Sequence, residues 1–220
     1  LLSFNDDIQG TAATAVGALL AAVAKSGTAL AEQRTVILGA GAAGTGIATL
    51  LIDAMVAAGL AREAATRSIW AVDRFGPVVQ GQPGLTPAQQ LLAQPADAVA
   101  GWATGPDGRI PLDELVRQVR PTVLIGTSAQ PGAFDEATIR AMAASVARPI
   151  IFPLSTPVTH CEAHPRDLLA WSDGRAIIGT GSPFGVDGVA QVNNVYIFPG
   201  IGLGARACGA TRISDSMFLA

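Results

Sequence analysis

The sequence has 220 residues, of which 50% are hydrophobic and only 14% are charged, so it can bury a sizeable packed core. This composition excludes intrinsic disorder, which requires low hydrophobicity and high charge. A formal net charge of −3 gives no electrostatic footprint for nucleic acid or for an acidic membrane surface. The two cysteines form no disulfide framework, which fits a reducing compartment, and we expect a cytoplasmic protein.

The longest apolar segment comprises residues 11–24 and follows a polar stretch that ends with Asp6 and Asp7. It is shorter than the roughly 20 residues that a membrane-spanning helix needs. Acidic residues precede it, whereas basic residues precede the apolar part of a signal peptide. We therefore expect a buried helix that extends to about Lys25 and stops at residues 26–28.

Apolar runs and glycine turns predict an alternation of strands and helices along the rest of the chain. Strands are expected at 35–39, 68–73, 122–126, 149–153, 176–179 and 195–198; helices at 41–58, 111–119, 134–147 and 166–171 and from about Gly200; and a loop at 76–86. The strands are continuous apolar runs, which is typical of a parallel sheet covered on both faces. The sequence thus predicts an α/β fold, a Rossmann-type doubly wound and mainly parallel sheet, in one domain spanning 1–220.

Three glycines, Gly39, Gly41 and Gly44, form a G-x-G-x-x-G pattern between a predicted strand and a predicted helix. In this pattern the first glycine makes a turn, the second admits a pyrophosphate, and the third permits close packing. The helix N-terminus supplies donors to the phosphates. Asp73 ends the next predicted strand, where an acidic side chain can accept hydrogen bonds from the ribose hydroxyls. The interval from Gly44 to Asp73 is longer than the usual ~20 residues, and an extra turn at 59–68 can account for the excess. The glycines could serve packing alone, but their context predicts dinucleotide binding.

The acidic pair after Asn5 has two interpretations. Asn and Asp side chains cap helix N-termini and favour the positive end of the helix dipole. Alternatively, Asp6 and Asp7 could contribute to a site for Mg²⁺ or Mn²⁺, which prefer carboxylate oxygens. One pair of aspartates cannot complete such a site, so further ligands must come from elsewhere.

The amides Asn193 and Asn194 could cap turns, or they could bind a nicotinamide carboxamide or a substrate carboxylate. His160, Cys161 and His164 have a spacing reminiscent of zinc ligands, but the sequence contains no second cluster that would complete a tetrahedral site. Nothing in the sequence marks Cys161 as a nucleophile with a lowered pKa.

Taken together, these motifs resemble the NAD-binding (C-terminal) domain of the malic enzyme family over nearly the whole chain. The matching stretches are FNDDIQGTA at 4–12, VILGAG at 36–41, AGTGI at 43–47, IWAVD at 69–73, GRAI at 174–177, GSPF at 181–184 and NNVYIFPG at 193–200. The first and last of these strings are much more specific than the glycine pattern.

The resemblance implies oxidative decarboxylation of L-malate to pyruvate and CO₂, with a nicotinamide dinucleotide as hydride acceptor and Mg²⁺ or Mn²⁺ holding the substrate. The residues after the second predicted strand, discussed below, favour NAD over NADP. It implies that Asp7 is the metal ligand, that Asp6 serves the acid–base network, and that Asn194 contacts substrate and nicotinamide. The residues expected to bind the dinucleotide are Gly39, Gly41, Ala43, Gly44, Asp73, Arg74 and Asn193. The expected partner is a small molecule, malate or a related hydroxy acid, without nucleic acid or membrane, and the full-length protein is expected to be a homo-oligomer.

The chain departs from the family in two respects. The family has an upstream domain with a lysine base, a tyrosine acid and two further acidic ligands, to which neither Lys25 nor Tyr196 corresponds. We therefore expect the upstream catalytic domain to be absent and this chain alone to be inactive. The family also has an asparagine where this chain has Thr156, which puts the exact substrate in doubt.

The choice between NAD and NADP depends on the residues after the second predicted strand. Asp73 would repel a 2′-phosphate, whereas Arg74 could bind one or could be a solvated surface charge. NADP-using relatives carry a lysine in the following loop, where this chain has no basic residue and a glutamine near Gln90. Two other functions remain open: an NAD-binding module without catalysis of its own, and a malolactic-type or divergent hydroxy-acid enzyme.

Overall fold

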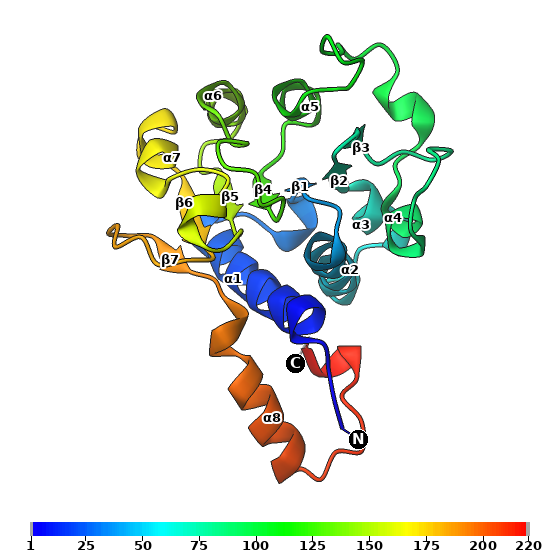
Figure 1. The fold of residues 1–220 in the computed structure, drawn as a ribbon, viewed down its shortest axis with the longest axis vertical. Helices are drawn as coiled ribbons and strands as arrows, with labels where there is room; N and C mark the ends of the chain where they lie inside the picture. Colours follow the sequence, from blue (N-terminus) through cyan, green and yellow to red (C-terminus); the bar gives the residue numbers. More distant parts are fainter. Residues whose placement is uncertain (1, 219–220) are drawn as a thin grey trace.

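A computed structural model describes residues 2–218, so the ends of the predicted 1–220 domain lie outside the described residues. Its centre is a seven-stranded sheet in the order β3-β2-β1-β4-β5-β6-β7, and every neighbouring pair is parallel except β2 with β3 (Figure 1). The strands are β1 (Thr35–Leu38), β2 (Ile69–Asp73), β3 (Gly76–Pro77), β4 (Val123–Gly126), β5 (Ile150–Pro153), β6 (Ile177–Thr180) and β7 (Ala190–Gln191). The strand order reverses between β1 and β4, and this switch point is where open α/β sheets bind ligands.

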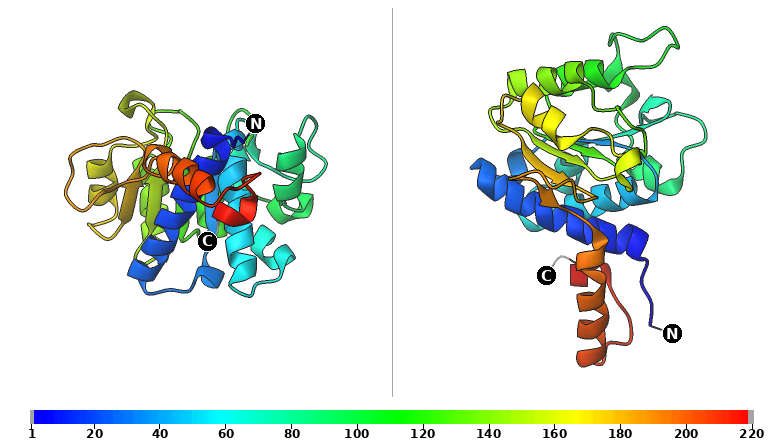
Figure 2. Two further views of the ribbon diagram at one scale, coloured as in Figure 1. Left: turned by 90° about the horizontal axis from the view of Figure 1, so that it is seen from below. Right: turned by 60° about the vertical axis from the view of Figure 1, so that its left-hand side comes forward.

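Helices cover both faces of the sheet, as the continuous apolar strands predict (Figures 1 and 2). On one face lie α1 (Thr11–Ser26), α2 (Ala42–Ala57), α3 (Arg62–Arg67) and α4 (Pro87–Leu92); on the other lie α5 (Leu112–Val119), α6 (Glu136–Ser145) and α7 (Pro165–Trp171). Successive strand residues alternate between two core clusters, with Ile37 in the first and Val36 and Leu38 in the second. The predicted doubly wound α/β class is therefore confirmed.

The N-terminal helix is longer than the apolar pattern predicts. A π-helical turn, η1 (Asp6–Gly10), continues into α1, and the 21 helical residues are long and apolar enough to cross a membrane. The helix nevertheless packs inside the domain, because Val16 and Leu19 lie in the core cluster that α2 completes. Gly27, in the left-handed conformation at φ 80°, ends α1 where the stop was predicted.

The predicted strand at 195–198 is wrong. Asn193 caps a 3-10 turn, η5 (Asn194–Tyr196), and α8 (Phe198–Ala207) follows with Pro199 in its first turn. Proline cannot donate to a strand ladder but suits the first turn of a helix. Helix α8 projects away from the body of the domain on the side where the two ends of the chain lie (Figure 2).

The segment after β2 has more structure than the predicted loop. Gly76 and Pro77 form the antiparallel strand β3. Thr86 caps the start of α4 with a capping box: its hydroxyl accepts from the Gln89 backbone N–H, and the Gln89 side chain accepts from the Thr86 backbone N–H. The predicted extra turn at 59–68 is confirmed as α3, which accounts for the long interval before Asp73.

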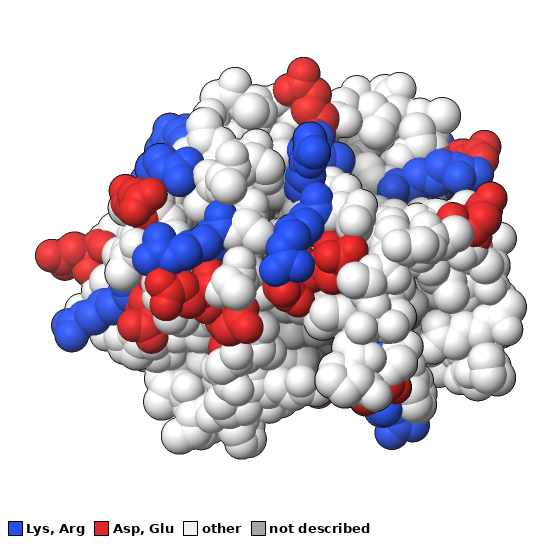
Figure 3. Space-filling view, turned by 90° about the horizontal axis from the view of Figure 1, so that it is seen from above, with Lys and Arg blue, Asp and Glu red and all other residues white. Residues whose placement is uncertain are grey.

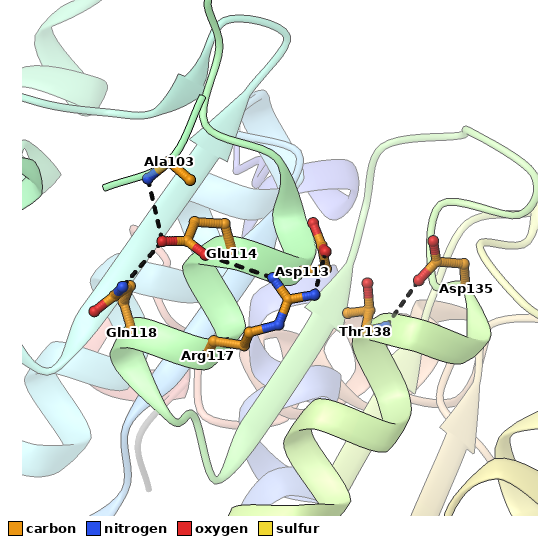
Figure 4. Close-up of polar contacts among 7 residues, drawn as sticks. All are labelled: Ala103, Asp113, Glu114, Arg117, Gln118, Asp135 and Thr138. Carbon is orange, nitrogen blue, oxygen red and sulfur yellow. Dashed lines mark hydrogen bonds and ion pairs between the residues drawn. The ribbon is translucent and has the colours of Figure 1, made fainter. Parts of the chain in front are cut away.

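Charged side chains gather on the outer face of α5 and α6, where Arg117 pairs with Asp113 at 2.6 Å (Figure 3). Figure 4 shows that Glu114 of α5 also accepts from the backbone N–H of Ala103 at 3.2 Å. Hydrogen bonds from Gln118 and Ala103 lower the pKa of Glu114. The carboxylate therefore anchors the start of the loop at 103–111, which carries residues of the site described below.

Candidate functional site

The glycine turn after β1 is held against the end of β4. Gly39 has φ +113°, and a Cβ there would lie 2.6 Å from the backbone carbonyl of Thr127. A Cβ on Gly44 would overlap the Gly39 carbonyl oxygen, whereas nothing lies within 4 Å of a Cβ built on Gly41. The Thr127 hydroxyl donates to the Gly39 carbonyl at 2.9 Å. The first and third glycines thus meet steric demands of the turn, and the second leaves its outer side open to a ligand.

Around this turn lies a cavity of about 710 Å³, which we call the glycine-turn pocket. It brings together four predicted dinucleotide residues: Gly39, Gly41, Asp73 and Arg74. The loop after β4 and the loop at 103–111 supply further walls, among them Thr127, Ser128, Gln130, Asp107 and Arg109.

The rim of the glycine-turn pocket holds two guanidinium groups, although the sequence indicated only one. Arg74 and Arg109 both lie over the ring of Phe75, with Cζ 4.8 and 5.5 Å from its centroid. Asp107 lies 3.6 Å from Arg109. Sequence reasoning missed Arg109 because only the loop at 103–111, distant in sequence, carries it back to the end of β2.

Asp73 ends β2 at this rim, and its Oδ1 accepts from the backbone N–H of Phe75 at 2.7 Å. The glutamine of α4 that lines the pocket is Gln89, whose side-chain amide donates to the Ala40 carbonyl at 3.0 Å. Gln90, which the sequence favoured, donates to the Leu85 carbonyl within its own segment.

A second cavity of about 260 Å³ lies between the start of α1 and the carboxyl ends of β4, β5 and β7; we call it the asparagine pocket. Its lining includes Asp7, Ala43, Thr156, Asn193 and Asn194, which come from segments far apart in the sequence. Thr127 lines both cavities, so the two pockets adjoin at the end of β4.

Asp6 lies beside the asparagine pocket and is tied to it through Asn194. The Asn194 amide donates to Asp6 Oδ2 at 2.7 Å, while the buried Asp6 Oδ1 has no hydrogen-bond partner among the described residues. Burial, followed by the nearby charge of Asp7, raises the pKa of Asp6, and the Asn194 bond offsets only part of that effect.

The helix-cap interpretation applies to Asn5, because its Oδ1 accepts from the Ile8 N–H at 3.1 Å. That leaves Asp7 exposed and in the pocket lining. The turn-cap interpretation applies to Asn193, whose Oδ1 accepts from the Val195 N–H and whose Nδ2 donates to the Gly181 carbonyl, both at 2.9 Å.

The structure gives Cys161 no nucleophilic character. Its thiol is buried and donates to the carbonyls of Pro153 and Ala163, and burial raises its pKa to about 11. Within residues 2–218 no three His, Cys, Asp or Glu side chains form a group that could hold a metal ion.

The sheet topology, the switch point and the glycine turn define a Rossmann-like dinucleotide-binding domain. Residues 8–220 match the family model described as "Malic enzyme, NAD binding domain". This chain therefore belongs to the family of malic enzyme NAD-binding domains.

Individual relatives agree with that assignment. NAD-dependent malic enzymes from Shewanella frigidimarina and Shewanella baltica are 48% and 50% identical over 99% of this chain. The chain spans about 40% of the length of these curated relatives. Among solved structures, an NAD-dependent malic enzyme from Thermotoga maritima aligns over 100% of this chain and 50% of its own, with a TM-score of 0.76 and 27% identity. The malic enzyme of Entamoeba histolytica aligns over 100% of this chain and 40% of its own, with a TM-score of 0.76 and 26% identity.

Proposed function

We propose that this chain is the dinucleotide-binding part of a malate oxidoreductase that converts L-malate to pyruvate and CO₂ with NAD and Mg²⁺ or Mn²⁺. The observation that carries the proposal is the contiguity of the glycine-turn pocket and the asparagine pocket at Thr127. Hydride transfer requires substrate and nicotinamide to be in contact, and adjoining pockets meet that requirement. The names of the curated relatives support the choice of substrate and cofactor.

In this proposal the glycine-turn pocket binds the dinucleotide. Gly39 and Gly44 shape the turn, Gly41 admits the pyrophosphate, and Ala43 lines the adjoining asparagine pocket. Asp73 accepts from the ribose hydroxyls and disfavours a 2′-phosphate, so NAD is preferred to NADP. Arg74 and Arg109 stay engaged with Phe75, and Asn193 holds the turn that borders the asparagine pocket.

Asp7 is the proposed metal ligand in this chain, because its exposed carboxylate lines the asparagine pocket and supplies the hard oxygen that Mg²⁺ and Mn²⁺ prefer. The described residues offer too few carboxylates there for a complete site, so the remaining ligands come from a part of the protein outside them. When bound, NAD supplies a hydride acceptor, and the cation polarises a substrate oxygen and stabilises the negative charge left by the departing CO₂.

In this proposal Asp6 takes part in proton transfer at the site, and Asn194 holds Asp6 in place. The raised pKa of Asp6 suits a group that exchanges protons, and its buried Oδ1 has no hydrogen-bond partner among the described residues. Asn194 fixes Asp6 through Oδ2 while it lines the pocket that would hold the substrate.

One observation favours an alternative, an NAD-binding module without catalysis. The lining of the asparagine pocket includes no lysine or tyrosine side chain within the described residues, so no general base of the family's type is at hand. A malolactic-type or divergent hydroxy-acid enzyme is the other alternative, because Thr156 lines the pocket where the family has asparagine.

The test is to assay the complete protein that carries this chain for NADH and pyruvate formation from L-malate with Mn²⁺. Equal amounts of the two products support the proposal. Binding of NAD without any turnover favours the module, and lactate formation from malate without net NADH favours the malolactic reaction. Size-exclusion chromatography and cell fractionation of the same protein test the proposed homo-oligomer and cytoplasmic location.

A further inference from the structure

A completely buried acid, Glu162, lies between the loops that follow β4 and β5. Its Oε1 accepts from the Ser128 N–H at 2.8 Å, from the Ser128 hydroxyl at 3.0 Å, and from the Ser155 hydroxyl at 2.6 Å. Its Oε2 accepts from the Ser155 N–H at 3.4 Å. No cation pairs with Glu162 within the part of the chain that is described. Burial of a carboxyl group is unfavourable unless its oxygens are satisfied, and here the two serines satisfy them.

The two serines belong to different pockets. Ser128 lines the glycine-turn pocket, whereas Ser155 lines the asparagine pocket beside Thr156. Glu162 is absent from the lining of both cavities. The carboxyl group therefore connects the two pockets through hydrogen bonds to Ser128 and Ser155, and it would contact neither ligand directly.

The backbone around this carboxyl group is adapted to it. A Cβ on Gly126, the last residue of β4, would lie 2.5 Å from the Glu162 carboxyl carbon, so a side chain there would displace the acid. Ala129 has φ 54°, a left-handed conformation that is unfavourable for alanine. Its N–H donates to the Ser155 hydroxyl at 2.9 Å, so the loop after β4 is held through the same serine that bonds Glu162.

We propose that Glu162 is a positioning residue that couples the glycine-turn pocket to the asparagine pocket through Ser128 and Ser155. This inference rests on the proposed dinucleotide site but not on the identity of the substrate. A rigid link between the pockets would keep the two ligands at a fixed separation, to which hydride transfer is sensitive. The coupling has a measurable consequence, since a change at Ser155 must be felt by a ligand that occupies only the glycine-turn pocket.

The probe for the experiment is ADP, which has the adenosine and pyrophosphate of the dinucleotide but lacks the part that would reach the asparagine pocket. Its dissociation constant is measured by calorimetry for the 220-residue chain and for Glu162→Gln, Ser155→Ala and the double variant. The control is Thr14→Ala, which removes a hydroxyl of the asparagine pocket that donates to the Gly10 carbonyl and has no contact with Glu162. Thermal unfolding of each variant checks that the chain is folded at the temperature of the titration.

We expect Ser155→Ala and Glu162→Gln each to weaken ADP binding by about three- to tenfold, and the double variant by no more than Glu162→Gln alone, because coupled residues are not additive. Thr14→Ala should bind ADP like the wild-type chain. Wild-type ADP affinity in folded Ser155→Ala overturns the coupling, even if Glu162→Gln fails to fold. No ADP binding by the wild-type chain removes the glycine-turn pocket as a site and the inference with it. ADP binding as expected in a protein that does not oxidise malate would contradict the proposed function and leave the coupling intact.

Discussion

At the scale of single residues, the asparagine pocket depends on contacts between the two ends of the sequence. Asp6 and Asn194 are 188 positions apart, yet their side chains bond at 2.7 Å. The sequence alone could name each residue, but it could not separate capping from chemistry. The structure shows the capping contacts of Asn5 and Asn193, whose side-chain oxygens accept from neighbouring backbone N–H groups.

Asp6→Asn should stabilise the isolated chain near neutral pH. The pKa of Asp6 is raised on folding, because the charged carboxylate is disfavoured in the folded state. Ionised Asp6 therefore lowers the free energy of unfolding at every pH above the pKa of the folded state. This destabilisation disappears as pH falls below the pKa of the unfolded state, so the gain in Tm, about 2 °C near pH 7, should vanish near pH 3. In the complete protein the same variant should lower kcat by about 10²–10⁴-fold. Thermal melts over this pH range test the change in stability, and steady-state assays test the change in kcat. A lower Tm of Asp6→Asn at pH 7 would contradict the predicted stabilisation.

Asp7→Asn should raise the concentration of Mn²⁺ that the complete protein needs and should collapse turnover. The amide keeps the shape of the side chain but removes the charge that binds a hard cation. The NAD affinity should stay within about twofold, because Asp7 lies outside the glycine-turn pocket. Metal titrations of activity and NAD calorimetry separate these effects. Unchanged metal dependence with a lower Tm would give Asp7 a structural role only.

Thr156→Asn should improve the use of malate. Thr156 lines the asparagine pocket, and an amide there would add a hydrogen bond to a charged substrate group, which contributes about 1.5–3 kcal/mol. The value of kcat/KM for malate should rise about tenfold or more. An unchanged or lower kcat/KM would mean that the surroundings of Thr156 suit a different hydroxy acid.

At the scale of elements, strands with continuous apolar runs could be predicted from the sequence, and elements that depend on capping or on distant contacts could not. The run at 35–38 is buried throughout and can only be a central strand. The run at 195–198 is equally apolar, but Val195 is 51% exposed and Pro199 blocks a ladder there, so it forms a turn and the start of α8. Helix α4 escaped prediction although Thr86 and Gln89 have the spacing of a capping box.

The loop at 103–111 belongs to this scale because it brings a second arginine to the dinucleotide site. We expect the chain to bind NAD⁺ more tightly than NADP⁺, since Asp73 lies at the same rim and Asp107 competes for Arg109. Calorimetry at fixed salt compares the two cofactors in the wild type, Arg74→Ala and Arg109→Ala. Tighter binding of NADP⁺ that either substitution abolishes would reverse the assignment and make that arginine the 2′-phosphate ligand.

At the scale of the whole molecule, the sheet, its two helical layers and both pockets form within the described residues, whereas the lining of the asparagine pocket there includes neither lysine nor tyrosine. The sequence resemblance predicts that a lysine base, a tyrosine acid and further acidic ligands lie in an upstream domain. The chain matches the family's NAD-binding domain and spans about 40% of the length of its curated relatives.

The measurement that tests this division most directly is a paired assay of the isolated 220-residue chain. Calorimetry should detect binding of NAD⁺, because the glycine turn and the pocket around it form within the described residues. Assays with L-malate, NAD⁺ and Mn²⁺ at the same protein concentration should detect no NADH, because proton transfer by positioned groups typically contributes about 10²–10⁴-fold and the described pocket offers no lysine or tyrosine. Malate-dependent NADH formation by the isolated chain, or failure to bind NAD⁺ at all, would contradict the account.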